Sequence, residues 1–221
     1  MRPQRERLLE AAVRIVAEKG YAATTIGDLT REASISRTTF YELYPDKEAC
    51  FLAAFDSVVE VLMRRIVRAY EAEEHWPERA RAGLRALLET LAEEPALARL
   101  AMVDISSVGP AAQRRHRVAM QRLTPLFDEG RDFAPRGHRL PANTSRMAVG
   151  GVTGLIADDL VAGRTERLPE LLGDLLFAVL VPYVGPHAAV EEIRLGEGRP
   201  QPGAVDGPGP ATAGRPPAGS P

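Results

Sequence analysis

Thr24-Thr25-Ile26-Gly27-Asp28-Leu29-Thr30-Arg31-Glu32-Ala33-Ser34-Ile35-Ser36-Arg37-Thr38-Thr39-Phe40-Tyr41-Glu42-Leu43-Tyr44-Pro45-Asp46-Lys47-Glu48 is the stretch that decides the fold. It predicts two short helices joined by a tight turn, because residues that cap helices precede each apolar segment. Thr24 or Thr25 can cap the first of these helices, and Ser36 can cap the second. Asp46 can cap a longer amphipathic helix that reaches about residue 71.

The second short helix has two faces of opposite chemistry. At about 100° per residue, Phe40 and Leu43 fall on one side of it, whereas Arg37, Thr38 and Tyr41 fall on the other. We expect the apolar side to pack against neighbouring helices, because a helix this short is not stable alone. The polar side would then be rigid and exposed, so it needs a partner.

The exposed residue types suit duplex DNA. A major groove admits an α-helix, arginine can bind guanine through O6 and N7, and threonine offers a hydroxyl and a methyl group to thymine. We therefore expect Arg37 and Thr38 to contact bases. Thr39 and Tyr41 add hydroxyls that can reach the DNA backbone, and Tyr41 can also touch a base edge.

Phosphate contacts are expected at two helix starts. Free backbone N–H groups and the positive dipole end favour phosphate oxygens at Thr24-Thr25 and at Asp46-Lys47, where Lys47 adds a full charge. Residues 1–48 hold eight basic and eight acidic side chains, so the net charge of this segment is zero. Binding should therefore depend on a few well-placed contacts rather than on bulk charge.

Residues 5–55 resemble the DNA-binding domain of the TetR family of bacterial transcriptional regulators. The residues that carry this resemblance are Thr24-Thr25, Ile26, Asp28, Leu29, Ala33-Ser34-Ile35-Ser36, Thr39-Phe40-Tyr41 and Lys47. Ser34 replaces the usual turn glycine, so we expect a residue with a Cβ in a left-handed conformation, at a cost of about 1 kcal/mol. Leu43 stands where members often have Tyr or His, which removes one phosphate contact common in the family.

The rest of the chain predicts an all-α fold with three parts. Residues 1–47 form the helix-turn-helix domain, residues 48–195 a larger helical domain, and residues 196–221 a disordered tail, because half of that tail is Gly or Pro. The expected helix boundaries are a stop at Gly20, starts at Pro77, Pro95 and Pro110, a break at Pro125, and two last helices over Ala142–Ala162 and Leu168–Val184.

Composition excludes several other classes of protein. The 221 residues include 28 basic and 30 acidic side chains and one cysteine, Cys50, so neither a disulfide framework nor a structural zinc cluster is expected. The chain has no signal peptide and no apolar run long enough to span a membrane, so we expect a cytoplasmic protein. The four histidines are dispersed and no catalytic motif occurs, so we expect no enzymatic activity, no metal and no cofactor.

The last two helices are the expected homodimer interface, since TetR-type regulators dimerise through a four-helix bundle of their final two helices. Small residues would allow close approach, and leucines and a valine would supply apolar area. The candidates are Gly150, Gly154, Leu155, Leu172, Leu176 and Val179. The glycines at positions 150 and 154 could instead serve tight packing within one chain.

The resemblance also implies a small-molecule pocket in the middle helices, whose occupation changes the separation of two DNA-reading heads. The candidate pocket residues are Met63, Tyr70, Trp76, Met102 and Phe127, although residues of these types are more often plain core. The resulting hypothesis is a dimeric repressor that binds a palindromic operator in double-stranded DNA and is released by an unknown effector. The alternative is a helical protein-interaction or architectural module without sequence-specific DNA binding.

Overall fold

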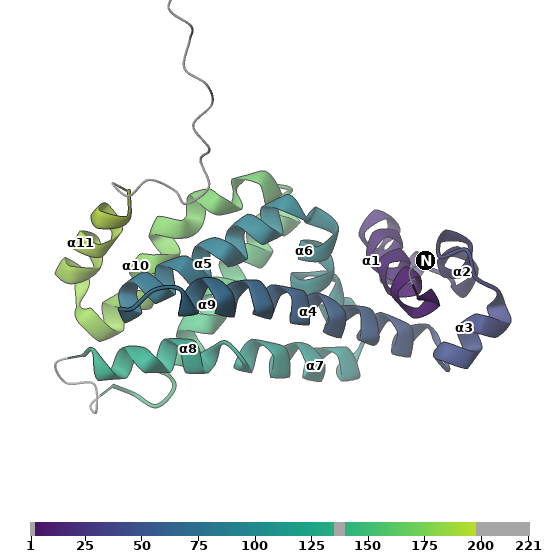
Figure 1. The fold of residues 1–221 in the computed structure, drawn as a ribbon, viewed down its shortest axis with the longest axis horizontal. Coiled ribbons are helices and arrows are strands. Elements are labelled where there is room, and N and C mark those ends of the chain that lie inside the picture. The colour runs from purple at the N-terminus through teal and green to yellow at the C-terminus, as the bar shows by residue number, and fades with distance from the viewer. Residues whose placement is uncertain (1–2, 135–139, 198–221) are drawn as a thin grey trace, which may run out of the picture.

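The computed structural model describes residues 3–134 and 140–197, and every regular element in these ranges is a helix (Figure 1). The all-α prediction is therefore confirmed. The elements are α1 (Gln4–Ala23), α2 (Ile26–Glu32), α3 (Arg37–Leu43), α4 (Lys47–Glu71), α5 (Trp76–Glu93), α6 (Pro95–Met102), η1 (Asp104–Ser107), α7 (Pro110–Gln121), α8 (Thr124–Asp128), η2 (Glu129–Asp132), α9 (Thr144–Val161), η4 (Thr165–Leu171), α10 (Leu172–Val184) and α11 (Pro186–Glu197), where η marks 3-10 helices.

The first three helices form a small unit at one end of the molecule (Figure 1). Each contributes a fully buried side chain, namely Leu8 from α1, Leu29 from α2 and Phe40 from α3. The regular part of α1 ends at Gly20, where φ is +78°, before one more turn reaches Ala23. The predicted stop at Gly20 is therefore confirmed, because only glycine takes this conformation without strain.

Helix α4 connects this unit to the larger domain (Figure 1). It starts at the predicted cap, where the Asp46 carboxylate accepts a hydrogen bond from the Ala49 N–H at 2.7 Å. It packs against α1 near its start and against α5 along its length. Helix α4 is therefore part of both the N-terminal unit and the larger domain.

The predicted proline boundaries are found in the structure. Pro95 and Pro110 are the first residues of α6 and α7, and Pro77 is the second residue of α5. First-turn N–H groups have no partner in a helix, so proline costs nothing there. The segment around Pro125 is divided as expected into α7 and α8, with Leu123 between them.

The C-terminal part differs from the prediction in two ways. Residues 165–171 form a 3-10 helix, so the helix expected from Leu168 begins at Leu172. A further helix, α11, follows Gly185 and packs against α10 and α5. The guanidinium of Arg81 in α5, which is buried, bonds to Glu192 of α11 and holds it there. The tail predicted to be disordered lies outside the described residues, except for its first two positions, which end α11.

Three properties of the described residues bear on function. No helix among them has both the length and the apolar character to cross a bilayer. No group of three or more His, Cys, Asp or Glu side chains in the described ranges is arranged to hold a metal ion. Cys50 is buried, and burial raises the pKa of its thiol to about 12, so the thiol stays protonated and unreactive.

Candidate nucleic-acid interface

A reciprocal cap closes the start of α2. The Asp28 N–H donates to Thr25 Oγ1 at 3.1 Å, and the Thr25 N–H donates to the Asp28 carboxylate at 2.9 Å. Lys19 Nζ, at the end of α1, donates to the same carboxylate at 2.5 Å. These bonds, first from Lys19 and then from Thr25, hold the pKa of Asp28 well below its usual range. Thr25, not Thr24, is therefore the cap, and its backbone N–H is already used within the protein.

Thr24 and Lys47, for which phosphate contacts are predicted, both form hydrogen bonds within the protein. The Thr24 side chain is only 2% exposed and donates to the Gly20 carbonyl at 2.8 Å, so it has no surface to offer to DNA. Lys47 Nζ donates to the carbonyls of Tyr21 and Thr24, each at 2.9 Å, and lies 4.2 Å from the centre of the Tyr21 ring. It ties the start of α4 to the end of α1, where the Tyr21 carbonyl also accepts from the Thr24 N–H at 3.2 Å.

The turn between α2 and α3 has the predicted geometry. Ser34 has φ of +52° and is the one non-glycine residue with positive φ among those described. Two residues later, the Ser36 Oγ accepts from the Thr39 N–H at 2.9 Å and caps α3. The Thr39 hydroxyl lies 3.0 Å from the same Oγ and is half-buried, so it already has a partner within α3.

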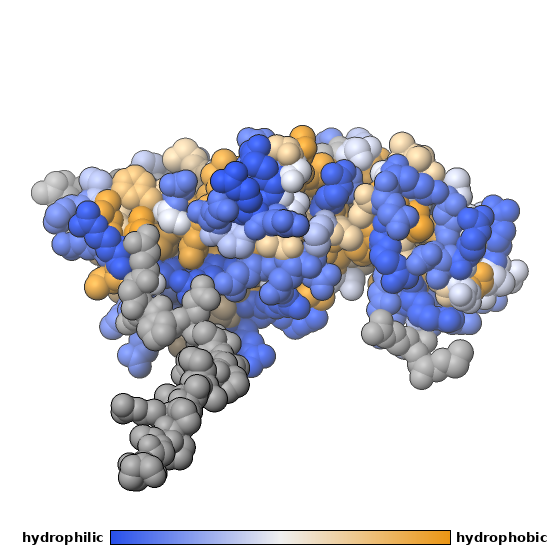
Figure 2. All heavy atoms as spheres, turned by 90° about the horizontal axis from the view of Figure 1, so that it is seen from above, coloured by the Kyte–Doolittle hydropathy of each residue, from blue (hydrophilic) through white to orange (hydrophobic). Residues whose placement is uncertain are grey.

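Helix α3 divides into two faces as predicted. Phe40 is fully buried, and its ring lies 5.5 Å from that of Tyr41 and 6.4 Å from that of Tyr44. Arg37 and Thr38 are exposed, and Tyr41 is 54% exposed. The surface at this end of the molecule is mostly hydrophilic (Figure 2). A buried aromatic thus fixes a helix that presents three side chains to solvent.

The Arg37 guanidinium is free to bind a ligand. It forms no ion pair with any residue of the described ranges, whereas Arg14 pairs with Glu32 at 2.8 Å and Arg31 lies 3.6 Å from Asp28. An unpaired arginine on a rigid helix can enter a major groove and bind a guanine edge through two hydrogen bonds. Helices α2 and α3, with the turn between them, define a helix-turn-helix protein.

Comparisons with known proteins agree with this class. Residues 8–54 match the family model described as "Bacterial regulatory proteins, tetR family". The chain is 33% identical over 93 residues to the transcriptional regulator EthR of Mycolicibacterium smegmatis, an alignment that covers 42% of this chain and 43% of that protein. It is 35% identical over 66 residues to the regulator YerO of Bacillus subtilis, covering 30% of this chain and 23% of that protein. The matched segments are thus less than half of these relatives.

Solved structures match over a longer range. The fatty acid degradation regulator FadR of Bacillus halodurans has a TM-score of 0.72 at 16% identity, covering 81% of this chain and 96% of that one. FadR of Bacillus subtilis, in complex with stearoyl-CoA, has a TM-score of 0.68 at 16% identity, covering 80% of this chain and 98% of that one. These likenesses establish the fold of the larger domain. Residues 8–54 therefore match the DNA-binding segment of tetR-family regulators, and the larger domain has the fold of solved structures from that family.

Two of the five candidate pocket residues meet at one cavity. A small, partly enclosed apolar space of about 20 Å³ lies between α4, α5, α8 and α9, and both Tyr70 and Phe127 line it. The Tyr70 hydroxyl lies 2.9 Å from the Leu126 carbonyl and 2.8 Å from the Glu129 carboxylate. Burial and then Glu129 raise the pKa of Tyr70, so its phenol is neutral at physiological pH.

The other three candidates lie elsewhere. Trp76 is fully buried outside this lining, and its indole N–H donates to the Leu126 carbonyl at 2.9 Å while its ring packs edge-on against Tyr183. Met102 is buried in α6 and does not line the cavity. Met63 lines a separate open groove on the outer side of α4. Tertiary packing, which single residue types do not reveal, separates these three from the cavity.

The candidate dimer-interface residues fall into an exposed group and a buried group. A Cβ at Gly150 or Gly154 would meet nothing within 4 Å in the chain, so neither glycine serves packing within the chain. Leu155 is exposed beside them, but Leu176 and Val179 are buried in the core and have no surface for a partner, and Leu172 is half-buried. The prediction was wrong for Leu176 and Val179 because α10 turns those positions toward the core.

Two residues that hold α1 and α2 together in the N-terminal unit were not predicted as site residues from the sequence. Lys19 links α1 to the α2 cap, and Asp28 accepts from both, yet neither was a predicted site residue. A signal was present, because Thr25 and Asp28 have the three-residue spacing of a capping box. The role of Lys19 depends on the bend at Gly20, which a linear pattern does not locate in space.

Proposed function

We propose that the protein is a ligand-responsive transcriptional repressor that binds a palindromic operator in double-stranded DNA as a homodimer. The observation that carries this proposal is the exposed face of α3, where the unpaired Arg37, Thr38 and Tyr41 stand over the fully buried Phe40. Arg37 and Thr38 would read base edges, and the Tyr41 hydroxyl would contact a base edge or the backbone. Thr25, Thr39 and Lys47 would fix the reading helix in its position.

The outward face of α9 supports the proposed homodimer. Small and apolar residues recur there at helical spacing and remain exposed, with Met147 at 64% and Val161 at 69% exposed. The residues of this face are Met147, Gly150, Gly151, Gly154, Leu155 and Val161, and α10 adds the exposed Phe177 and Ala178. Exposed small and apolar residues gathered on one face in this way, around the single acidic residue Asp158, are typical of an interface. Two subunits would place two α3 helices in successive major grooves, about 34–36 Å apart.

Control by a ligand follows from the connection between α7 and α4. Arg115 pairs with Asp56 at 2.7 Å, and Arg122 pairs with Glu60 at 2.6 Å, so two ion pairs join α7 to α4. A ligand that displaces α7 and α8 would therefore move α4, which Lys47 ties to the DNA-facing unit. The ligand changes the spacing of the two α3 helices only if it prefers one spacing.

The test is a footprint of the full-length protein on the DNA upstream of its own coding sequence. The proposal expects protection of two inverted half-sites separated by about one helical turn, with loss of protection when an effector is added. Protection without any sequence preference would instead support an architectural module. A footprint on one half-site only would contradict the homodimer.

A further inference from the structure

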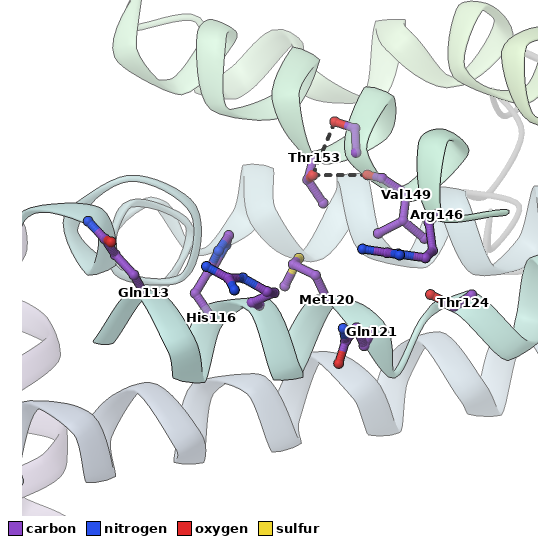
Figure 3. A pocket seen from close by; sticks show the side chains of 10 residues that line it. Gln113, His116, Met120, Gln121, Thr124, Arg146, Val149 and Thr153 are labelled. Atoms are coloured by element: carbon purple, nitrogen blue, oxygen red, sulfur yellow. Dashed lines mark hydrogen bonds between the residues drawn. The ribbon is translucent and has the colours of Figure 1, made fainter. Parts of the chain in front are cut away.

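An open groove of about 420 Å³ lies between α7 and α9 and has no role in the proposed DNA interface (Figure 3). Its wall on the α7 side includes His116, Arg117 and Met120, and its wall on the α9 side includes Arg146 and Val149. Figure 3 shows side chains from both helices converging on this space.

The groove is cationic. Arg117 and Arg146 both line it, and none of the ten lining residues is acidic. Within the described ranges, Arg117 forms no ion pair, and Arg146 donates only to the neutral amide oxygen of Asn143, at 3.2 Å. Burial lowers the pKa of His116, so its ring adds no charge at neutral pH. Two uncompensated guanidinium groups therefore face one groove, which is the arrangement that carboxylates and phosphates bind.

The groove and the apolar cavity share a wall. Val149 lines both spaces, and Thr124 in the groove directly follows Leu123 in the cavity. Beyond Val149 the cavity is lined almost wholly by apolar side chains, with Tyr70 and Phe127 at its far side. A path from the cationic groove past Val149 thus leads from charged to apolar surroundings.

We propose that the groove and the cavity form one binding site for an amphipathic anion, with the anionic head at Arg117 and Arg146 and a straight apolar tail passing Val149 into the cavity. This inference rests on the proposed ligand-responsive function and names the class of effector. The head is a carboxylate, as in a fatty acid, or the phosphates of a fatty acyl carrier thioester, since both bind guanidinium groups.

The cavity must enlarge to accept the tail. At about 20 Å³ it has room for roughly one water molecule, which is far less than an acyl tail needs. The break between α7 and α8 borders both spaces, and Arg122 beside it pairs with Glu60 of α4. Entry of the tail would therefore move the segment that is tied to α4, which gives binding a route to the DNA-facing unit.

The experiment is a titration of the full-length protein with myristate, myristoyl-CoA, CoA alone and the neutral tetradecanol, followed by calorimetry. Trp76 is the single tryptophan, and its indole N–H bonds to the carbonyl of Leu126, which lines the cavity, so its fluorescence reports entry of a tail independently. We expect saturable binding of at least one of the two acylated anions with a change in Trp76 fluorescence. Which of the two acylated compounds binds shows whether the anionic head is a carboxylate or the phosphates of the carrier.

Two variants and their controls separate the parts of the site. Arg117→Gln with Arg146→Gln should weaken the acylated anion about tenfold or more and leave tetradecanol unchanged, because charged hydrogen bonds are lost. Val149→Phe should weaken every compound that has a tail. The matched controls are Arg114→Gln, on α7 but outside the lining, and Val118→Phe, an exposed position on α7, and both should bind as the natural protein does.

Three results would overturn the inference. They are binding of CoA alone as tight as that of myristoyl-CoA, binding of the acylated anions unaffected by the paired arginine variant, and no binding of any acylated anion. DNA binding measured on the same preparations separates this failure from that of the proposed function. If the protein still binds its operator and responds to another compound, the proposed function stands and the proposed ligand site is wrong.

Discussion

Helix α3 and the cavity beneath Tyr70 are built in opposite ways. In α3 the supporting side chain, Phe40, is fully buried, the caps are formed, and Arg37 is exposed without an ion pair in the described ranges. The cavity is apolar and holds no more than about one water molecule. The comparison teaches that α3 is already held in place in the free protein, whereas a ligand that enters the cavity would have to enlarge it.

The largest expected effect is the loss of folding stability when the buried side chain that supports α3 is removed. Phe40→Ala should lower the free energy of unfolding by about 3–5 kcal/mol and abolish DNA binding, because it removes the buried aromatic that fixes the helix. Tyr41→Ala, its exposed neighbour, should cost about 1 kcal/mol or less. Urea unfolding of both variants measures this, and equal losses would show that α3 is not held as described.

The next effect concerns the α9 surface. Gly154→Arg should weaken the dimer by about 2 kcal/mol or more, because a long charged side chain would have to be buried where two α9 helices approach closely. The fold of each subunit should be unchanged, since a side chain at this position meets open space within the chain. Sedimentation equilibrium measures the dimer constant, with Val118→Arg on α7 as the control. An unchanged dimer constant would place the interface elsewhere.

Lys47 tests whether the link between α1 and α4 is structural. Lys47→Met should cost about 1–3 kcal/mol of folding stability, because two carbonyls lose a charged donor, and should weaken binding to all DNA sequences alike. Thermal unfolding and DNA titrations measure the two losses. A normal stability with weakened DNA binding would instead support the phosphate contact expected from the sequence.

The smallest effect concerns the α2 cap. The folded pKa of Asp28 is lowered, so its contribution to stability is present above its unfolded pKa, roughly 3.9, and is lost as the pH falls through the folded value. Asp28→Asn should therefore lower the melting temperature at pH 7 and should flatten its decline between about pH 4 and pH 2. Parallel declines in the variant and the natural protein would contradict this role.

The sequence predicts features that depend on residues close together in the chain, and not those that depend on residues far apart. The caps Ser36 and Asp46, the left-handed Ser34 and the two faces of α3 depend on residues a few positions apart, and the structure has all of them. Lys47 forms its bonds 23 and 26 residues away along the chain, and Trp76 bonds 50 residues away, so their roles depend on the tertiary fold.

The larger domain shows the same limit. Leu176 and Val179 are as apolar as an interface residue would be, but the rotation of α10 places them in the core. Helix α11 was not predicted, although Gly185-Pro186 marks its start. The groove between α7 and α9 joins residues up to 40 positions apart, from Gln113 to Thr153, and no local motif indicates it.

The most direct test of the central claim is the affinity of Arg37→Ala for the operator and for a random duplex of equal length at one salt concentration. We expect a loss of about 1–3 kcal/mol on the operator, a much smaller loss on the random duplex, and relaxed preference at one base pair in each half-site. Equal losses on both duplexes would contradict the claim that α3 reads bases through Arg37.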